Sequence, residues 1–357
     1  MLPADFQGEG TGPVVSSPSL DIQKIKRDNQ KLFFFGFVGF LALAFIIALA
    51  IASYRVYSKV VTDNFTVTVA RILRLPAMKV NGKIVFYTDY VADLKAISAM
   101  RAYDKTRGGS GASLTDEAMS DQVLFRLVNN LLVAGAARQF GLTVEDKDIA
   151  EVKSQILSTQ FASLAEADKA LTERYGWNLA TYEIRVIRPF ILQNKLAEKI
   201  KNDPATRAAV KAQAETVLDQ IKSGDDFSAL AKQYGQDSTA DKGGDLGWFG
   251  QGEMVPQFEA AVFALKKGEL SQILVESPFG FHIVRLDDRK TEKGKDEKGK
   301  TATKELVKAS HILFALPTLD QYLNKLVRQA DIHLYIKIHD PFKVLRDAAV
   351  AKISQGK

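Results

Sequence analysis

The sequence predicts an α+β protein with a single N-terminal transmembrane helix. Three observations support this prediction: an uninterrupted apolar run near the N-terminus, helical periodicity through the middle of the chain, and short glycine-punctuated strands and helices in its last third. The chain has 357 residues, 46% of them hydrophobic, which is enough apolar material for two modest cores.

Composition limits the chemistry that the chain can support. It contains no cysteine, which excludes disulfides and thiolate metal sites. The net charge of +6 comes largely from flanking segments and a linker, so nucleic-acid binding is not expected. Any histidine chemistry must come from four residues: His282, His311, His333 and His339.

The apolar run covers residues 32–52 and contains no charged side chain. At 1.5 Å per residue it spans roughly 30 Å, the thickness of a hydrocarbon core. A cleaved signal peptide is the alternative, because Ala50-Ile51-Ala52 resembles a small-x-small cleavage site. The run exceeds a signal-peptide core of about 7–15 residues. We therefore predict a retained membrane helix over residues 32–53.

Basic residues flank the run more densely on its N-terminal side. They are Lys24, Lys26, Arg27 and Lys31 before the run, and Arg55 and Lys59 after it. The positive-inside rule places the N-terminus in the cytoplasm. Residues 1–31 are then a cytoplasmic tail, and the chain after the membrane helix lies outside the cytoplasm as a single-pass cell-membrane protein.

Residues 54–203 predict a mainly helical domain. Alternating β-branched residues at 65–75 predict one strand, and Asn81-Gly82 predicts a tight turn after it. Helices are expected from Thr88, from Ser113 to Gly141, and over 163–175 and 179–201. The region has no paired carboxylates, histidine cluster or phosphate-binding glycine loop, so it reads as a scaffold.

Residues 204–286 are punctuated by glycines that force tight turns between short elements. These elements present Leu246, Met254 and Phe258 in a stretch that also carries Asp237 and His282. Apolar side chains beside a few polar groups are typical of a small hydrophobic pocket. On pattern alone, the three apolar residues fit an ordinary core equally well.

Three motifs follow one another in this stretch: GGDLGWF at 243–249, MVPQF at 254–258 and FGFHI at 279–283. Their order resembles the parvulin family of peptidyl-prolyl cis-trans isomerases. The resemblance implies a small antiparallel four-stranded sheet with surrounding helices, and an isomerase that needs no cofactor or metal. The preceding region, with its Asn-Gly turn and GLTVEDKDIAEV at 141–152, resembles the N-terminal domain of periplasmic parvulin chaperones, which binds unfolded chains.

One parvulin element is out of place. The family begins with a strand similar to A-S-H-I-L, which here follows the other motifs at 309–313. A charged, solvated linker at 290–304 separates the two parts. We predict a circularly permuted parvulin domain over 204–316. A second, truncated copy starting at Ala309 is the alternative, but no GGDLG or FGFH equivalent follows it.

The resemblance implies a role for each matching residue. His311 and His282 are the paired histidines on adjacent strands, and Asp237 faces them. The substrate-binding residues are Leu246, Met254 and Phe258 around the proline ring, with Ser277 and Phe279 near the substrate backbone. His333 and His339 match no motif and are expected on the surface of a strand.

The C-terminal segment, 317–357, is expected to return to the helical domain. Thr318 is predicted to cap a helix over 320–330, and a strand over 331–338 is predicted to pair with 65–75. The tail from residue 340 is expected to be exposed. The predicted function is prolyl isomerisation that assists folding of exported, unfolded polypeptides containing X-Pro bonds. The alternative is a holdase whose weak or inactive parvulin domain docks peptides.

Overall fold

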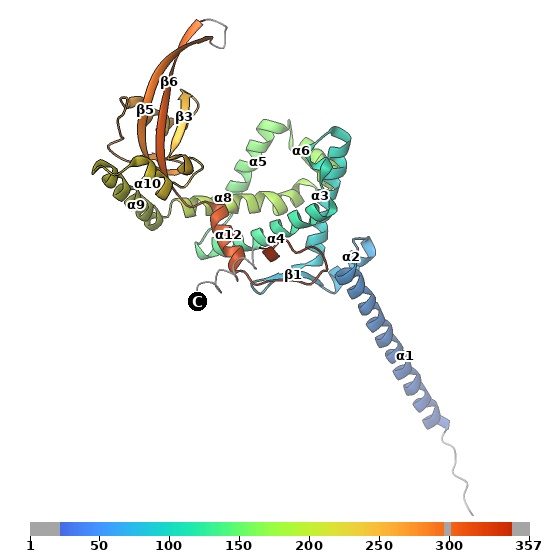
Figure 1. Ribbon diagram of the computed structural model, residues 1–357. Helices are drawn as coiled ribbons and strands as arrows, with labels where there is room; N and C mark the ends of the chain where they lie inside the picture. Colours follow the sequence, from blue (N-terminus) through green and yellow to red (C-terminus); the bar gives the residue numbers. More distant parts are fainter. Residues whose placement is uncertain (1–21, 296–300, 345–357) are drawn as a thin grey trace, which may run out of the picture. The chain divides into compact units, whose positions relative to one another are not determined.

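The computed structural model describes residues 22–295 and 301–344 (Figure 1). It confirms the α+β class, with two separate antiparallel sheets and many helices. Two compact units divide at residue 75, the second beginning at Pro76, and each is described by itself.

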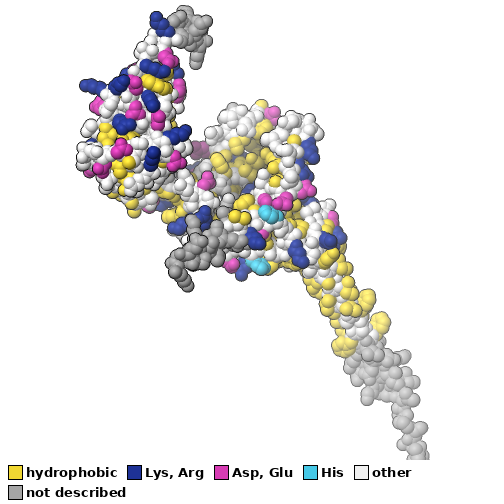
Figure 2. Space-filling view, in the orientation of Figure 1, with side chains coloured by type: hydrophobic (Ala, Val, Ile, Leu, Met, Phe, Trp, Pro, Cys, Tyr) yellow, Lys and Arg dark blue, Asp and Glu magenta, His cyan; other side chains and the backbone are white. Residues whose placement is uncertain are grey.

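The first unit contains the predicted membrane helix. Helix α1 (Ile22–Ser53) continues into a π-helical turn (Tyr54–Ser58), and the stretch Phe33–Ser58 is long and apolar enough to cross a membrane. Its mean hydropathy is 2.8, and none of the apolar window is buried. Hydrophobic side chains cover the coloured part of this helix in Figure 2. The predicted tail falls partly within α1, and residues 1–21 lie outside the described part of the chain.

The predicted strand at 65–75 is wrong, because this segment forms helix α2 (Asn64–Ile72). Local polar contacts override the β-branched composition. Asp63 caps the helix by accepting a hydrogen bond from the Thr66 backbone N–H at 3.0 Å. The Thr66 hydroxyl also accepts a hydrogen bond from Arg55 Nε at 2.8 Å.

A three-stranded sheet opens the second unit. Its order is β2 (Lys83–Phe86), β1 (Pro76–Val80) and β7 (Ile332–Leu334), all antiparallel. Asn81 and Gly82 have φ of +47° and +80°, which confirms the predicted tight turn. The predicted pairing of the C-terminal strand with 65–75 is wrong. The strand β7 pairs with β1, because the segment 65–75 is helical.

Helices fill the rest of this region. They are α3 (Tyr87–Arg107), α4 (Asp116–Gln139), α5 (Asp146–Gln160), α6 (Leu164–Tyr175), α7 (Leu179–Tyr182), α8 (Arg188–Lys201) and, later in the chain, α12 (Leu319–Gln329). A 3₁₀ turn (Ser110–Ser113) precedes α4, so Thr115 caps that helix and not Ser113. A π-helical turn (Glu183–Ile187) joins α7 to α8. Thr318 caps α12 as predicted, in a reciprocal capping box with Gln321.

The second sheet has four antiparallel strands in the order β3-β6-β5-β4. These are β3 (Asp245–Gly250), β4 (Val275–Ser277), β5 (Gly280–Lys295) and β6 (Thr301–Ala315). Helices α9 (Pro204–Lys222) and α10 (Phe227–Tyr234) share one apolar cluster with Phe281, Ile283, Ile312 and Phe314. Helix α11 (Pro256–Ala264) shares another with Val284, Leu286, Val307 and Ala309. Because side chains alternate along a strand, His282 and His311 fall on the α11 face.

The predicted linker at 290–304 is wrong for most of its length. Strand β5 continues to Lys295 and β6 starts at Thr301, and these two residues are partners in register. Figure 1 shows the resulting long hairpin. Charged side chains stabilise it without a core: Arg289 and Glu305 form an ion pair across the strands, and Lys290 lies 4.4 Å from the centre of the Trp248 ring. Residues 296–300 lie outside the described part.

The C-terminal segment is less exposed than predicted. Phe342 is fully buried, and its ring packs edge-on against Phe125 of α4 with centroids 4.9 Å apart. Residues 345–357, which include most of the predicted exposed tail, lie outside the described part.

Candidate active site

The pairing of β5 with β6 brings two histidines from distant parts of the sequence into contact. In register, His311 lies opposite Val284 and His282 opposite Leu313, so the two rings are diagonal neighbours on one face. Their Nδ1 atoms are 3.1 Å apart, and the rings are nearly parallel, with an interplanar angle of 17°. Both side chains are buried.

Asp237 lies in the loop after α10 and faces His311. Its Oδ2 atom is 2.8 Å from His311 Nε2. The backbone N–H and the hydroxyl of Thr239 both donate hydrogen bonds to the other oxygen, Oδ1, at 3.0 and 2.7 Å. Thr239 thus fixes the carboxylate in place. Sequence reasoning missed this residue, although an Asp followed two positions later by Thr is a recognisable turn signal.

Ser277 extends the contacts on the other side of the pair. Its Oγ lies 2.7 Å from His282 Nε2 and accepts a hydrogen bond from the Phe279 N–H at 3.1 Å. Ser277 was predicted near the substrate backbone, but its hydroxyl is buried against the histidine. Phe279 remains 59% exposed at the rim.

The protonation states follow from these surroundings. Burial lowers the pKa of His282 to about 4, with the neighbouring His311 acting in the same direction. Burial also lowers the pKa of His311, although Asp237 opposes the shift. Burial raises the pKa of Asp237, but the Thr239 hydrogen bonds and His311 outweigh it and leave the pKa below its usual value. At neutral pH both imidazoles are therefore neutral and Asp237 is ionised.

A neutral imidazole has one donor and one acceptor nitrogen, which fixes the direction of the contacts. An ionised carboxylate only accepts, so the proton of His311 lies on Nε2 and its Nδ1 is the acceptor. His282 then donates from Nδ1, and its Nε2 accepts from the Ser277 hydroxyl. One chain of close contacts runs from Ser277 through His282 and His311 to Asp237. His311 Nε2 lies 2.8 Å from Asp237 Oδ2, although this contact does not have the geometry of a hydrogen bond.

An apolar surface lies directly against this chain. The Phe258 ring is buried and meets both imidazoles edge-on, with centroids 5.1 Å from His282 and 5.4 Å from His311. Leu246 and Met254 pack partly buried in the same apolar cluster as Phe258. The structure thus brings together the predicted histidines, Asp237 and Ser277, with the three predicted apolar residues beside them.

Gly244 is a further residue on which the geometry depends. Its carbonyl accepts a hydrogen bond from the His311 N–H at 2.9 Å, and its φ is +85°. A Cβ at this position would lie 2.2 Å from the His311 carbonyl oxygen. Only glycine therefore allows the backbone before β3 to approach β6 here. Its signal in the sequence was the Gly-Gly-Asp motif.

The lowered histidine pKa values predict how the stability of the fold depends on pH. An unfolded histidine has a pKa near 6.5, so the folded state binds fewer protons below that value. The associated stability is present above about pH 6.5 and is lost as pH falls through the folded pKa of His282, about 4. We expect the imidazole NMR signals of His282 to stay neutral from about pH 8 to about pH 6. An imidazolium signal from His282 in that range would contradict the assignment.

Comparison with known proteins identifies two domains in the chain and a family to which it belongs. A PPIC-type peptidyl-prolyl isomerase domain matches residues 189–290, and a SurA-like N-terminal domain matches residues 22–175. Foldase protein PrsA from Geobacillus kaustophilus is 33% identical over 198 residues, which cover 53% of this chain and 69% of the relative. This chain belongs to the PrsA foldase family.

Other relatives of the foldase family and of its chaperone counterpart cover smaller shares. PrsA from Caldanaerobacter subterraneus is 32% identical over 181 residues, covering 47% of this chain and 57% of the relative. Chaperone SurA from Bordetella avium is 45% identical over 109 residues, covering 30% of this chain and 20% of SurA. The isomerase-domain match ends at residue 290, so it does not include β6 and His311.

Proposed function

We propose that this chain is a membrane-anchored peptidyl-prolyl isomerase that assists folding of exported proteins. The observation that carries the proposal is the buried Ser277–His282–His311–Asp237 chain set against Phe258. It joins neutral polar groups to an apolar surface, which suits a substrate that is itself an uncharged amide with an apolar ring.

Prolyl isomerisation needs no nucleophile, because no covalent bond breaks. The barrier of about 18–20 kcal/mol comes from the lost resonance of the planar amide. A site accelerates the rotation by binding the twisted amide better than either planar form. We assign Leu246, Met254 and Phe258 to the proline ring. Lowering the barrier by about 5 kcal/mol would accelerate the rotation several thousandfold.

The histidine pair contributes by staying neutral and fixed. A charged imidazolium would attract water to the apolar surface, whereas two neutral rings locked in defined tautomers keep their dipoles oriented at little reorganisation cost. Asp237 orients His311, and Ser277 orients His282. Phe279, exposed beside Ser277, is assigned to the substrate backbone on the strength of its position.

Circular permutation of the isomerase domain is part of the proposal. The pairing of β6 with β5 supports permutation: Ala309 lies opposite Leu286, and Ile312 lies opposite Ile283. Strand β6, which comes last in the sequence of this sheet, thus lies in the middle of the sheet. The proposed isomerase domain spans 204–316. The chaperone-like domain spans 54–203 and receives the segment 317–357, while 1–31 and 32–53 are the cytoplasmic tail and membrane helix.

Membership of the foldase family and the apolar helix α1 support a membrane anchor and exported polypeptides as clients. The basic residues before the apolar run favour a cytoplasmic N-terminus, so the site would face exported chains outside the membrane. The proposed substrates are X-Pro bonds in unfolded polypeptides. The test is a cis-trans relaxation assay on a proline peptide with the full chain in detergent. Relaxation no faster than the uncatalysed rate would refute isomerase activity.

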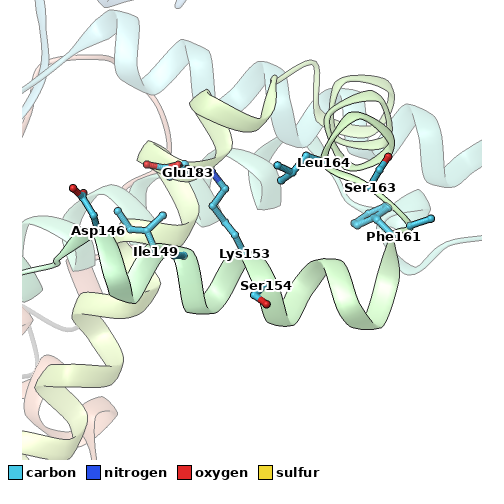
Figure 3. Close-up of a pocket in the computed structure, with 10 residues that line it drawn as sticks. Asp146, Ile149, Lys153, Ser154, Phe161, Ser163, Leu164 and Glu183 are labelled. Carbon is cyan, nitrogen blue, oxygen red and sulfur yellow. Dashed lines mark hydrogen bonds and ion pairs between the residues drawn. The ribbon is translucent and has the colours of Figure 1, made fainter.

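A specific observation also favours a holdase role. Two adjoining hollows of about 800 and 310 Å³ lie among α5, α6 and the α7–α8 turn. They share Lys153, Phe161 and Leu164 as lining residues. Figure 3 shows these side chains around the larger hollow, where Lys153 and Glu183 pair at 3.1 Å. A groove with apolar walls and an ion pair suits extended, mixed-polarity segments of unfolded chains.

Leu164→Asp is expected to weaken suppression of client aggregation while leaving prolyl isomerisation unchanged. Leu164 is 48% exposed and is the first residue of α6, where an acidic side chain is compatible with the helix. The change therefore places a charge in the groove without unfolding it. The matched control is Ile84→Asp on the exposed edge strand β2. Equal aggregation suppression by both variants and wild type would argue against the groove.

A further inference from the structure

A second polar cluster lies outside the isomerase site, where the start of α4 meets the C-terminal segment. His339 Nδ1 lies 3.0 Å from both carboxylate oxygens of Asp121 and 3.9 Å from Glu117 Oε1. One ligand atom from each of the three residues lies within 4.8 Å of the others. His339 was expected on a strand, but β7 ends five positions earlier, at Leu334.

The cluster is built by two segments that run along each other. Glu117, Asp121 and Phe125 follow one another at four-residue intervals, so they share one stripe of α4. The C-terminal segment places His339 against the two carboxylates and the fully buried Phe342 against Phe125. The hydrophobic contact holds the segment close enough for His339 to reach the acidic pair.

The distances suit a shared metal ion. Bond lengths of about 2.0–2.2 Å from zinc to nitrogen and oxygen place neighbouring ligand atoms of a tetrahedral site about 3.4 Å apart. The observed separations of 3.0 and 3.9 Å bracket that value. One imidazole with two carboxylates is a donor set for zinc and similar transition metals, whereas magnesium and calcium prefer oxygen ligands alone.

The charge of the cluster and its exposure to solvent also favour a bound metal ion. Among the described residues, neither Glu117 nor Asp121 forms an ion pair with a lysine or arginine, so His339 is the one cationic partner at hand. The side chains of Glu117 and His339 are 68% and 51% exposed, and that of Asp121 is 22% exposed. An ion can therefore enter from solvent, and a water molecule can complete its coordination.

We propose that Glu117, Asp121 and His339 bind a zinc-like divalent transition metal, which fastens the C-terminal segment to α4. This site replaces the expectation from sequence that the chain binds no metal. It is independent of the isomerase chemistry, since it uses none of the residues on β5 and β6. Metal binding is expected to make the segment around Phe342 more ordered.

The chain offers a low background for the test. It has no cysteine and only four histidines, two of which, His282 and His311, are buried. Zinc would be titrated calorimetrically into the untagged full chain in detergent. We expect one equivalent to bind, and we expect His339→Ala or Asp121→Asn to weaken binding by about tenfold or more. His333→Ala, which removes an exposed histidine outside the cluster, is the matched control and should bind like wild type.

Hydrogen exchange provides a second readout. Zinc should slow exchange of backbone amides in 335–344 in wild type and His333→Ala, but not in His339→Ala. The proposal is overturned if wild type binds no zinc, or if His339→Ala and Asp121→Asn both retain the full equivalent. Retention by these two variants would mean that the ion binds elsewhere, for example at the His282–His311 pair.

Discussion

Replacing Gly244 by alanine is expected to destabilise the four-stranded sheet by about 3 kcal/mol or more and to abolish most isomerase activity. The new Cβ would lie 2.2 Å from the His311 carbonyl oxygen, and alanine would be strained at φ +85°. The backbone before β3 must therefore move away from β6. That movement breaks the hydrogen bond from the His311 N–H to the Gly244 carbonyl and displaces the imidazole.

Gly247→Ala is the matched control for this variant. Gly247 also has a positive φ of +73°, but no atom lies within 4 Å of a Cβ built there. Alanine at this position should lower the free energy of unfolding only by the backbone strain, about 1 kcal/mol. Hydrogen exchange of the β6 amides measures both effects. Similar protection of β6 in the two variants would show that the close approach at Gly244 does not hold His311.

Replacing His311 by alanine is expected to lower kcat/KM for prolyl isomerisation by about 100-fold, with most of the loss in kcat. The change leaves the Nδ1–H of His282 and the carboxylate of Asp237 without their partner. Buried groups that lose their partners reorient or recruit water. The apolar surface of Phe258 would then face a wetter and less ordered wall.

Two variants separate this effect from general destabilisation. His333→Ala removes an exposed histidine of β7 that packs edge-on against Tyr335, and it should leave the rate unchanged. Asp237→Asn keeps the shape of the side chain but removes its charge, so the loss should be smaller than for His311→Ala. A rate for His311→Ala within about twofold of wild type, with the fold intact, would exclude the histidine pair from catalysis.

Features encoded within a few residues could be predicted from the sequence. The Asn81-Gly82 turn and the Thr318 cap depend on the local backbone preferences of those residues. The juxtaposition of His282 and His311 could also be predicted from the sequence. It follows from recognising a displaced strand at 309–313 and from the tendency of antiparallel strands to join as hairpins.

Features that depend on distant contacts could not be predicted in the same way. The helix after Asp63 is an exception, because it depends on local contacts whose signal the β-branched composition masked: Asp63 and Arg55 both bond to Thr66. The charged stretch after Arg289 reads as a solvated linker, but cross-strand register keeps it extended as a hairpin. Pairing of β7 with β1 and burial of Phe342 against α4 join residues that lie far apart in sequence.

The most direct test of the account is the rate at which the full chain in detergent relaxes an X-Pro peptide from cis to trans. Uncatalysed relaxation takes tens to hundreds of seconds. We predict a large acceleration by wild type, a nearly complete loss of that acceleration in His311→Ala, and wild-type rates in His333→Ala. Wild-type relaxation at the uncatalysed rate, or His311→Ala as fast as wild type, would contradict an active centre at the β5–β6 histidine pair.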